Sequence, residues 1–94
     1  MSKIHNQRGK ASFYLFELQE VASTVICELT RNAVALRERA AEAKTKRERD
    51  ALRYEAEGHV LEARKFISWT YGDTDRAIEI EELVDVAVSA IKMP

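Results

Sequence analysis

The residues best placed for metal chemistry are Glu55, His59 and Glu62, which follow one another at intervals of four and three. This spacing puts three side chains on one face of a helix, and imidazole and carboxylate groups are common metal ligands. No second cluster completes a coordination shell, and 33% of the residues are charged, so such triplets arise by chance. We interpret the three residues as a solvated polar face and expect neither a metal nor another cofactor.

Residues suited to enzymatic catalysis are equally sparse. The only other histidine is His5, and the sequence has no phosphate-binding glycine loop, no Cys-x-x-Cys motif and no nucleophile matched to a base and an orienting group. The single cysteine, Cys27, lies in the largely apolar segment Val25–Leu29, which favours a small buried residue over a reactive thiol. A lone cysteine also excludes an internal disulfide and suits a reducing compartment. We expect a protein that is not an enzyme.

A basic segment in the middle of the chain offers contacts for phosphate groups. Residues 31–53 hold eight basic and four acidic residues, and clustered Lys and Arg side chains bind phosphates with release of counterions. The interleaved acids and the lack of an aromatic residue within residues 31–53, where Tyr54 is the nearest, favour a solvated face instead, and both interpretations stay open. The phosphate-binding hypothesis, which covers nucleic acids and nucleotides, assigns the contacts to Lys3, Arg8, Lys10, Arg37, Lys44, Lys46, Arg47 and Arg49.

Aromatic and acidic residues near the C-terminus offer contacts for a protein partner. Trp69 and Tyr71 lie beside a predicted turn, and exposed aromatic residues are frequent anchors of interfaces. Residues 73–92 add six acidic and two basic residues, which suits a basic partner surface. Core packing explains the same aromatic residues, and we predict Trp69 and Phe66 in the core. The protein-binding hypothesis names Tyr14, Trp69, Tyr71, Asp73, Asp75, Glu79 and Glu82.

The elements that position these residues are helices. Residues 11–71 contain no proline and one glycine, Gly58, in a background rich in Ala, Leu, Glu, Arg and Lys. One helix of that length would span roughly 90 Å and bury little, so we expect it to fold back. Apolar residues vanish at residues 44–47, where Thr45 and Glu48 fit an N-terminal capping box. The pattern predicts two antiparallel helices, at about residues 11–43 and 47–70.

A third helix is predicted at the C-terminus. Gly72 suits the end of the second helix, and Asp73 or Thr74 suits the N-cap of a helix at about residues 74–92. Residues 1–10 carry three positive charges and no acid, and we interpret them as a basic N-terminal arm before a single domain, residues 11–94. The expected fold is all-α: an antiparallel hairpin with a third C-terminal helix, forming a three-helix base from which a basic two-helix arm protrudes.

The antiparallel register places small residues near the hairpin turn and large ones near the base. It also sets Gly58 opposite Ala33, where a missing side chain would let the two backbones approach, offsetting the roughly 1 kcal/mol that a mid-helix glycine costs. Leu29 falls opposite Ala63, inside the predicted core. A break of the second helix at Gly58 is the alternative, and the sequence leaves it open.

Together these features favour an interaction module. The charges nearly cancel, to a net of −1, no segment approaches the ~18 apolar residues of a membrane span, and the first residues are too polar for a signal peptide. We expect a cytoplasmic adaptor, regulator or inhibitor of a host protein or of nucleic-acid-binding machinery, of the kind that phages encode. The broad apolar surface of the first helix favours a homo-oligomer, most simply a homodimer; nucleic-acid or nucleotide binding is the alternative.

Overall fold

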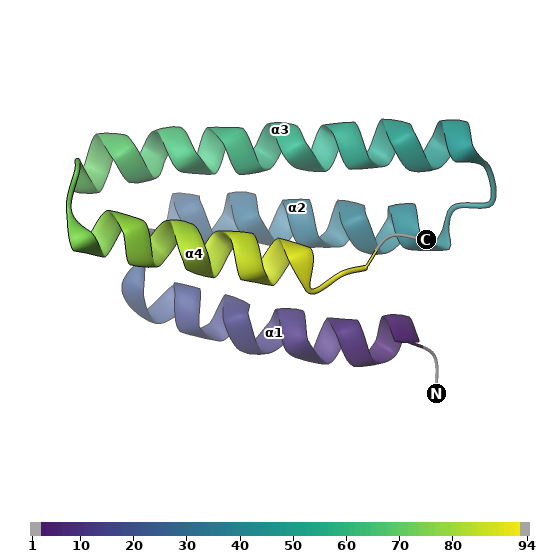
Figure 1. Ribbon diagram of the computed structural model, residues 1–94, viewed down its shortest axis with the longest axis horizontal. Coiled ribbons are helices and arrows are strands. Elements are labelled where there is room, and N and C mark those ends of the chain that lie inside the picture. Colours follow the sequence, from purple (N-terminus) through teal and green to yellow (C-terminus); the bar gives the residue numbers. More distant parts are fainter. Residues whose placement is uncertain (1–2, 93–94) are drawn as a thin grey trace.

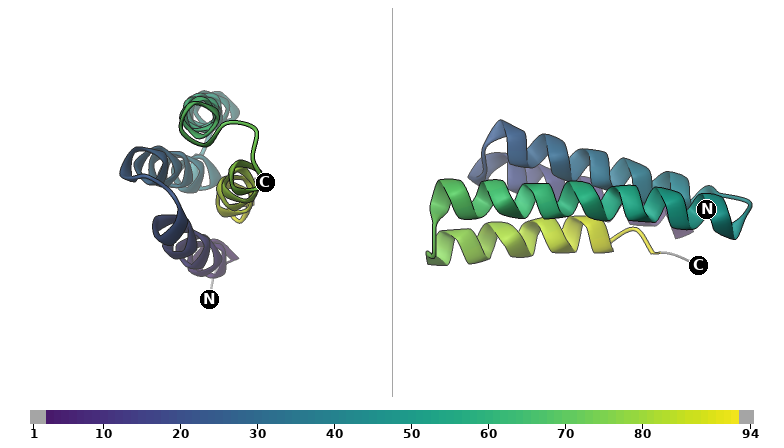
Figure 2. Two further views of the ribbon diagram at one scale, coloured as in Figure 1. Left: turned by 90° about the vertical axis from the view of Figure 1, so that its left-hand side faces the viewer. Right: turned by 90° about the horizontal axis from the view of Figure 1, so that it is seen from above.

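The protein is a bundle of four antiparallel helices. The computed structural model describes residues 3–92, with side chains from residue 9 onward. In chain order the helices are α1 (Lys3–Val21), α2 (Thr24–Glu42), α3 (Lys46–Tyr71) and α4 (Asp75–Ser89). Viewed end-on they occupy the corners of the bundle in that order, so α1 packs on α2 and α4 and lies diagonally across from α3 (Figure 1, Figure 2). The all-helical class is confirmed, whereas the prediction of three helices is wrong.

The predicted first helix is in fact two helices that meet at Ser23. This residue has an extended backbone, with φ −68° and ψ 159°, and its side chain accepts a hydrogen bond of 3.4 Å from the backbone N–H of Ile26. Serine is a favoured N-cap, so the chain can end α1, reverse and start α2 without glycine or proline. Residues 3–10, expected as a separate basic arm, are instead the first turns of α1.

The predicted hairpin turn is confirmed. Thr45 has an extended backbone and its side chain accepts a hydrogen bond of 3.2 Å from the backbone N–H of Glu48, which makes Thr45 the N-cap of α3. From this turn α3 runs back along α2 (Figure 1). It is continuous over 26 residues, so the alternative of a break at Gly58 is excluded.

The turn between α3 and α4 also follows the prediction. Gly72 ends α3 with a positive φ of 64°, a conformation that costs a residue with a side chain more than it costs glycine. The hydroxyl of Thr74 donates to the carbonyl of Tyr71 and accepts from the backbone N–H of Ala77, at 3.0 and 3.2 Å. Thr74 is therefore the N-cap of α4, and the chain reverses within three residues.

Two groups of buried residues fill the bundle. The base core lies toward the Gly72 turn and consists mainly of large aliphatic residues: Leu18, Ile26, Ile67, Ala77, Ile80 and Val84. The tip core lies toward the Thr45 turn and is rich in alanine: Ala11, Ala33, Val34, Leu36, Ala40, Leu52, Ala56, Ala87, Val88 and Ile91. The predicted change from small residues near the hairpin turn to large ones near the base is therefore confirmed.

The expected protruding two-helix arm is not present as such. Ala40 and Leu52, which flank the hairpin turn, share the tip core with Ala11 of α1 and with Ile91, which follows α4. The hairpin tip is therefore packed on residues from both ends of the described chain. The N-terminal half of the predicted first helix covers this region, because as α1 it turns back along α2 instead of extending it.

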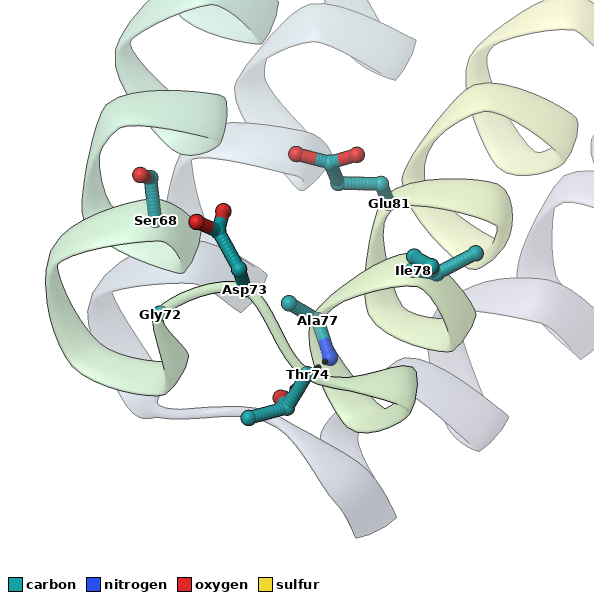
Figure 3. Close-up of a pocket in the computed structure, with 7 residues that line it drawn as sticks. All are labelled: Ser68, Gly72, Asp73, Thr74, Ala77, Ile78 and Glu81. Carbon is teal, nitrogen blue, oxygen red and sulfur yellow. Dashed lines mark hydrogen bonds between the residues drawn. The ribbon is translucent and has the colours of Figure 1, made fainter.

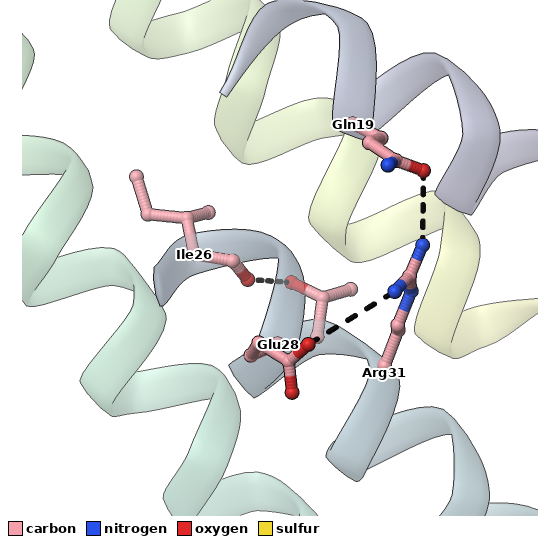
Figure 4. Close-up of polar contacts among 5 residues, drawn as sticks. Gln19, Ile26, Glu28 and Arg31 are labelled. Atoms are coloured by element: carbon pink, nitrogen blue, oxygen red, sulfur yellow. Dashed lines mark hydrogen bonds and ion pairs between the residues drawn. The ribbon is translucent and has the colours of Figure 1, made fainter. Parts of the chain in front are cut away.

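Polar contacts clasp neighbouring helices at the surface. Arg31 of α2 donates to the side-chain oxygen of Gln19 of α1 at 3.0 Å and lies 4.0 Å from Glu28 (Figure 4). Arg64 of α3 donates to Asp85 of α4 at 2.8 Å; that hydrogen bond and the negative charge of Asp85 raise the pKa of Arg64 above its usual value. Both clasps are solvent-exposed, so each adds little to stability and mainly orients the helices.

Candidate protein-binding surface

The outer face of α3 carries apolar side chains that the bundle leaves uncovered. Trp69, Tyr54 and Leu61 expose 84%, 79% and 59% of their surface. They follow one another at intervals of seven and eight residues, close to two turns of a helix, so they lie on the same side. That side is opposite the buried stripe that begins with Leu52 and Ala56.

Trp69 is the most exposed of these residues, and its predicted place in the core is wrong. Residues two apart in a helix point in nearly opposite directions, so the fully buried Ile67 turns Trp69 outward. Its ring leans on the ring of Phe66, with centroids 6.1 Å apart and planes at 51°. Phe66 is half-buried against the base core, so it supports one edge of the indole while the rest faces solvent.

A shallow hollow adjoins this end of α3. Its lining comes from the last turn of α3, the Gly72 turn and the first turns of α4, and Figure 3 shows the carboxylates of Asp73 and Glu81 together with Ser68 around it. Ile78 adds an apolar wall and is 57% exposed. Asp73, which the protein-binding hypothesis names, therefore lies one turn beyond Trp69 and gives this end an acidic border.

The remaining residues of that hypothesis are dispersed. Asp75, Glu79 and Glu82 are exposed on α4. Tyr71 is half-buried, and its hydroxyl donates to the carbonyl of Val21 at 3.5 Å, which joins the end of α3 to the end of α1.

Tyr14 belongs to a different part of the surface. It is half-buried on α1 against the tip core, in edge-to-face contact with Phe13 at 5.6 Å and 75°. Phe13 and Phe16 of α1 are themselves 59% and 63% exposed. The structure therefore brings Trp69 and Asp73 to one end of the bundle and leaves Tyr14 in a second aromatic group.

The predicted phosphate-binding residues divide into an outer and an inner group. Lys10 is exposed on α1, and Lys44, Lys46 and Arg47 are exposed around the hairpin turn, where Lys46 lies 4.0 Å from Asp50. Arg37 and Arg49 are half-buried. Lys3 and Arg8 belong to α1, and their side chains fall outside the described residues.

One of the two inner arginines, Arg37, lies near the C-terminal end of α4. Arg37 donates through Nη2 to the carbonyl of Ile91 at 3.0 Å. Burial lowers the pKa of Arg37, the positive charge of Arg53 lowers it further, and Glu57 opposes both effects. The Nε atoms of Arg37 and Arg49 are buried and have no hydrogen-bond partner among the described residues.

The polar face predicted from Glu55, His59 and Glu62 lies on α3. Glu55 and His59 lie along a groove between α2 and α3, beside Arg39. Across the part of the chain that the structure describes, no group of three His, Cys, Asp or Glu residues has the arrangement of a metal site. Their neighbour across the groove is a cation, which is consistent with the interpretation as a polar surface face.

The outer face of α3 is the feature that sequence reasoning missed. Tyr54 and Leu61 belong to neither site hypothesis, because both hypotheses rest on charged residues and on the aromatic residues beside the predicted turns and N-terminus. A signal was available: the outward positions recur at intervals of three and four just as the inward ones do. A search for a second stripe on α3 would have found it.

Comparison with protein families, curated proteins and solved structures finds no match to this chain. Within the described residues, none of the helices is long and apolar enough to span a membrane. The function is therefore argued from the surface of the molecule.

Proposed function

We propose that this chain is a non-enzymatic protein-binding module whose binding surface is the outer face of α3. The observation that carries the proposal is Trp69, a tryptophan that is 84% exposed in a bundle that has room for large side chains in its base core. Tryptophan and tyrosine are enriched among residues that dominate interface energetics. Tyr54 and Leu61 lie on the same face as Trp69, so three large apolar side chains form a stripe along this helix.

Polar and charged residues surround the apolar stripe on α3, as they surround the apolar centre of a typical protein interface. Interfaces typically have an apolar centre and a polar border that stays partly hydrated. Here Lys65 lies within the stripe, and exposed Glu57 and Glu62 flank it. Asp73 and Glu81 border the Trp69 end. This border favours a partner whose own rim carries basic residues.

Surface variants with a matched control test the proposal. Trp69→Glu places a charge in the stripe, and Phe16→Glu does the same on α1, where Phe16 is 63% exposed. We expect both variants to keep the helical circular-dichroism spectrum, because both side chains are largely in solvent. Photo-crosslinking through a benzoylphenylalanine at position 65 should capture the partner protein. Trp69→Glu should abolish this crosslink, whereas Phe16→Glu should preserve it. The reverse pattern would move the binding surface to α1 and refute the proposal.

A second candidate function is the binding of an anion, such as a nucleotide or a nucleic-acid phosphate, at the inner arginines. Two buried guanidinium Nε atoms, in Arg37 and Arg49, have no partner in the part of the chain that the structure describes, which favours this function, because such groups are costly to leave unpaired. A thermal-shift series with inorganic phosphate and ATP tests it. We expect a rise in melting temperature that Arg49→Gln removes and added salt weakens. No shift at low ionic strength would reject this function.

A further inference from the structure

The groove between α2 and α3 gathers polar groups of four different kinds. It has a volume of about 270 Å³, close to the lower end of the range for small-molecule sites. Its lining comes from one face of α2 and from two residues one turn apart on α3: Asn32, Ala35, Leu36, Arg39, Glu55 and His59. An amide, a guanidinium, a carboxylate and an imidazole therefore border one space.

The polar side chains of the groove are free to meet a ligand. Asn32, Arg39 and Glu55 are exposed, and His59 is half-buried. Within the part of the chain that the structure describes, none of these four side chains makes a hydrogen bond or an ion pair. A ligand in the groove could therefore bind them without breaking a contact that the bundle uses.

Arg39 and Glu55 carry opposite charges on the two walls of the groove, yet they do not pair. Elsewhere on the molecule such charges do meet across a helix interface, since Arg64 of α3 bonds to Asp85 of α4 at 2.8 Å. A guanidinium binds a carboxylate through two parallel hydrogen bonds, and a carboxylate accepts hydrogen bonds from an ammonium group. The two walls therefore suit a ligand that carries both charges.

The groove also has an apolar part. Leu36 is 7% exposed, and its neighbour Ala35 is exposed on the same helix. Both line the groove together with the polar side chains. An aliphatic group that covers them loses its own contact with water, which is favourable. A small zwitterion with an aliphatic side chain matches the charged and the apolar parts at once.

We propose that this groove binds a free aliphatic α-amino acid. Arg39 holds its carboxylate, Glu55 accepts hydrogen bonds from its ammonium group, and its side chain lies over Ala35 and Leu36. The site goes beyond the proposed protein-binding function, because none of its lining residues belongs to the apolar stripe on α3. A small ligand in an open groove binds weakly, and we expect a dissociation constant on the order of 1 mM.

Titration followed by nuclear magnetic resonance tests the class of ligand. L-leucine is the probe, isocaproate lacks its ammonium group, and isoamylamine lacks its carboxylate. We expect leucine to shift the imidazole resonances of His59 and the side-chain amide of Asn32, and each half-ligand to bind at least about tenfold more weakly. Isocaproate that binds as tightly as leucine would indicate an anion site and overturn the proposal. No saturable shift up to about 20 mM leucine, far above the expected dissociation constant, would also overturn it.

Variants with matched controls test the contacts. Arg39→Gln and Glu55→Gln each remove one charge at an exposed position, so both should keep the helical spectrum and weaken leucine binding at least about tenfold. Ala35→Leu should fill the groove and abolish binding. Arg47→Gln and Glu82→Gln make the same chemical changes at exposed positions outside the groove and should bind like the parent chain. Unchanged affinity in both Arg39→Gln and Glu55→Gln would overturn the site.

One variant separates this site from the protein-binding surface. Trp69 does not line the groove, so Trp69→Glu should leave the affinity for leucine unchanged. Loss of leucine binding in Trp69→Glu, with Arg39→Gln unaffected, would place the ligand on the outer face of α3 and overturn the groove as its site.

Discussion

The base core and the tip core hold the same bundle together by different means. One of the six buried residues of the base core is alanine, whereas five of the ten in the tip core are. Each buried methylene contributes about 0.8 kcal/mol, so the base core contributes more per residue, while alanines let helix backbones approach closely. The difference teaches that a single buried residue contributes more to stability at the Gly72 end, whereas small side chains at the Thr45 end permit close helix packing.

Truncating a base-core residue should have the largest effect. Ile67 is fully buried in the base core, and Ile67→Ala should lower the free energy of unfolding by about 2–5 kcal/mol, through lost burial and the cavity that remains. Urea denaturation followed by circular dichroism measures this. Leu61→Ala on the outer face of the same helix is the control and should change it by less than about 0.5 kcal/mol. Equal losses for the two variants would contradict the assignment of the inner face.

Enlarging a tip-core residue should have the next largest effect. Ala33 is fully buried among other small residues, and Ala33→Leu should cost about 1–3 kcal/mol because the helices must separate to admit it. Ala35→Leu is the control. Ala35 lies two residues further along α2 on its exposed side, so this substitution should hardly change the free energy of unfolding. If Ala33→Leu stabilised the protein, the tip core would contain unfilled space and the close-packing interpretation would be wrong.

Removing either threonine N-cap, at the start of α3 or of α4, should lower the free energy of unfolding by a similar amount. Thr45 and Thr74 each accept a hydrogen bond of 3.2 Å from a backbone N–H in the first turn of a helix. Thr45→Ala and Thr74→Ala should each cost about 1 kcal/mol, and the serine variants should retain most of the stability. Thermal melts give the size, and amide exchange should show which helix start has frayed. Serine variants as unstable as the alanine variants would exclude the capping role.

Gly58 within α3 and Gly72 at its C-cap should respond to alanine in opposite directions. Gly58→Ala should raise the stability of the monomer by about 0.5–1 kcal/mol, because the new methyl group meets nothing and glycine is a poor helix former. Gly72→Ala should lower it by about 1 kcal/mol, since φ is 64° at this position. Thermal melts of the two variants and the parent chain, followed by circular dichroism, are the measurement. A loss of stability in Gly58→Ala would indicate a contact that the bundle does not contain.

The local signals in the sequence predicted the reversals of the chain well. Thr45, Gly72 and Thr74 act where their residue types predicted, because capping depends on hydrogen bonds within a few residues. Ser23 was missed, although it is chemically equivalent to Thr45. Apolar residues continue on both sides of Ser23, so the hydrophobic pattern gives no sign that α1 ends there and α2 begins.

Which side of each helix faces the core was harder to predict than where the helices begin and end. Trp69 and Leu29 were both placed in the core, yet Trp69 is exposed and Leu29 is half-buried. Which side of a helix is covered depends on how many helices surround it, and the predicted count was three. For the same reason Gly58 was assigned to a contact inside the bundle, whereas its surroundings are open. The covered and uncovered faces of α3 therefore follow from the presence of four helices among the described residues.

The order of the helices around the bundle bears on how the chain folds. Every pair of adjacent corners joins consecutive helices except the pair of α1 and α4, so most native contacts form between segments that are close in sequence. Helical bundles of this low contact order fold within microseconds to milliseconds. The docking of α1 against α4 closes the longest loop, and we expect it to be the step at which the bundle first opens when it unfolds.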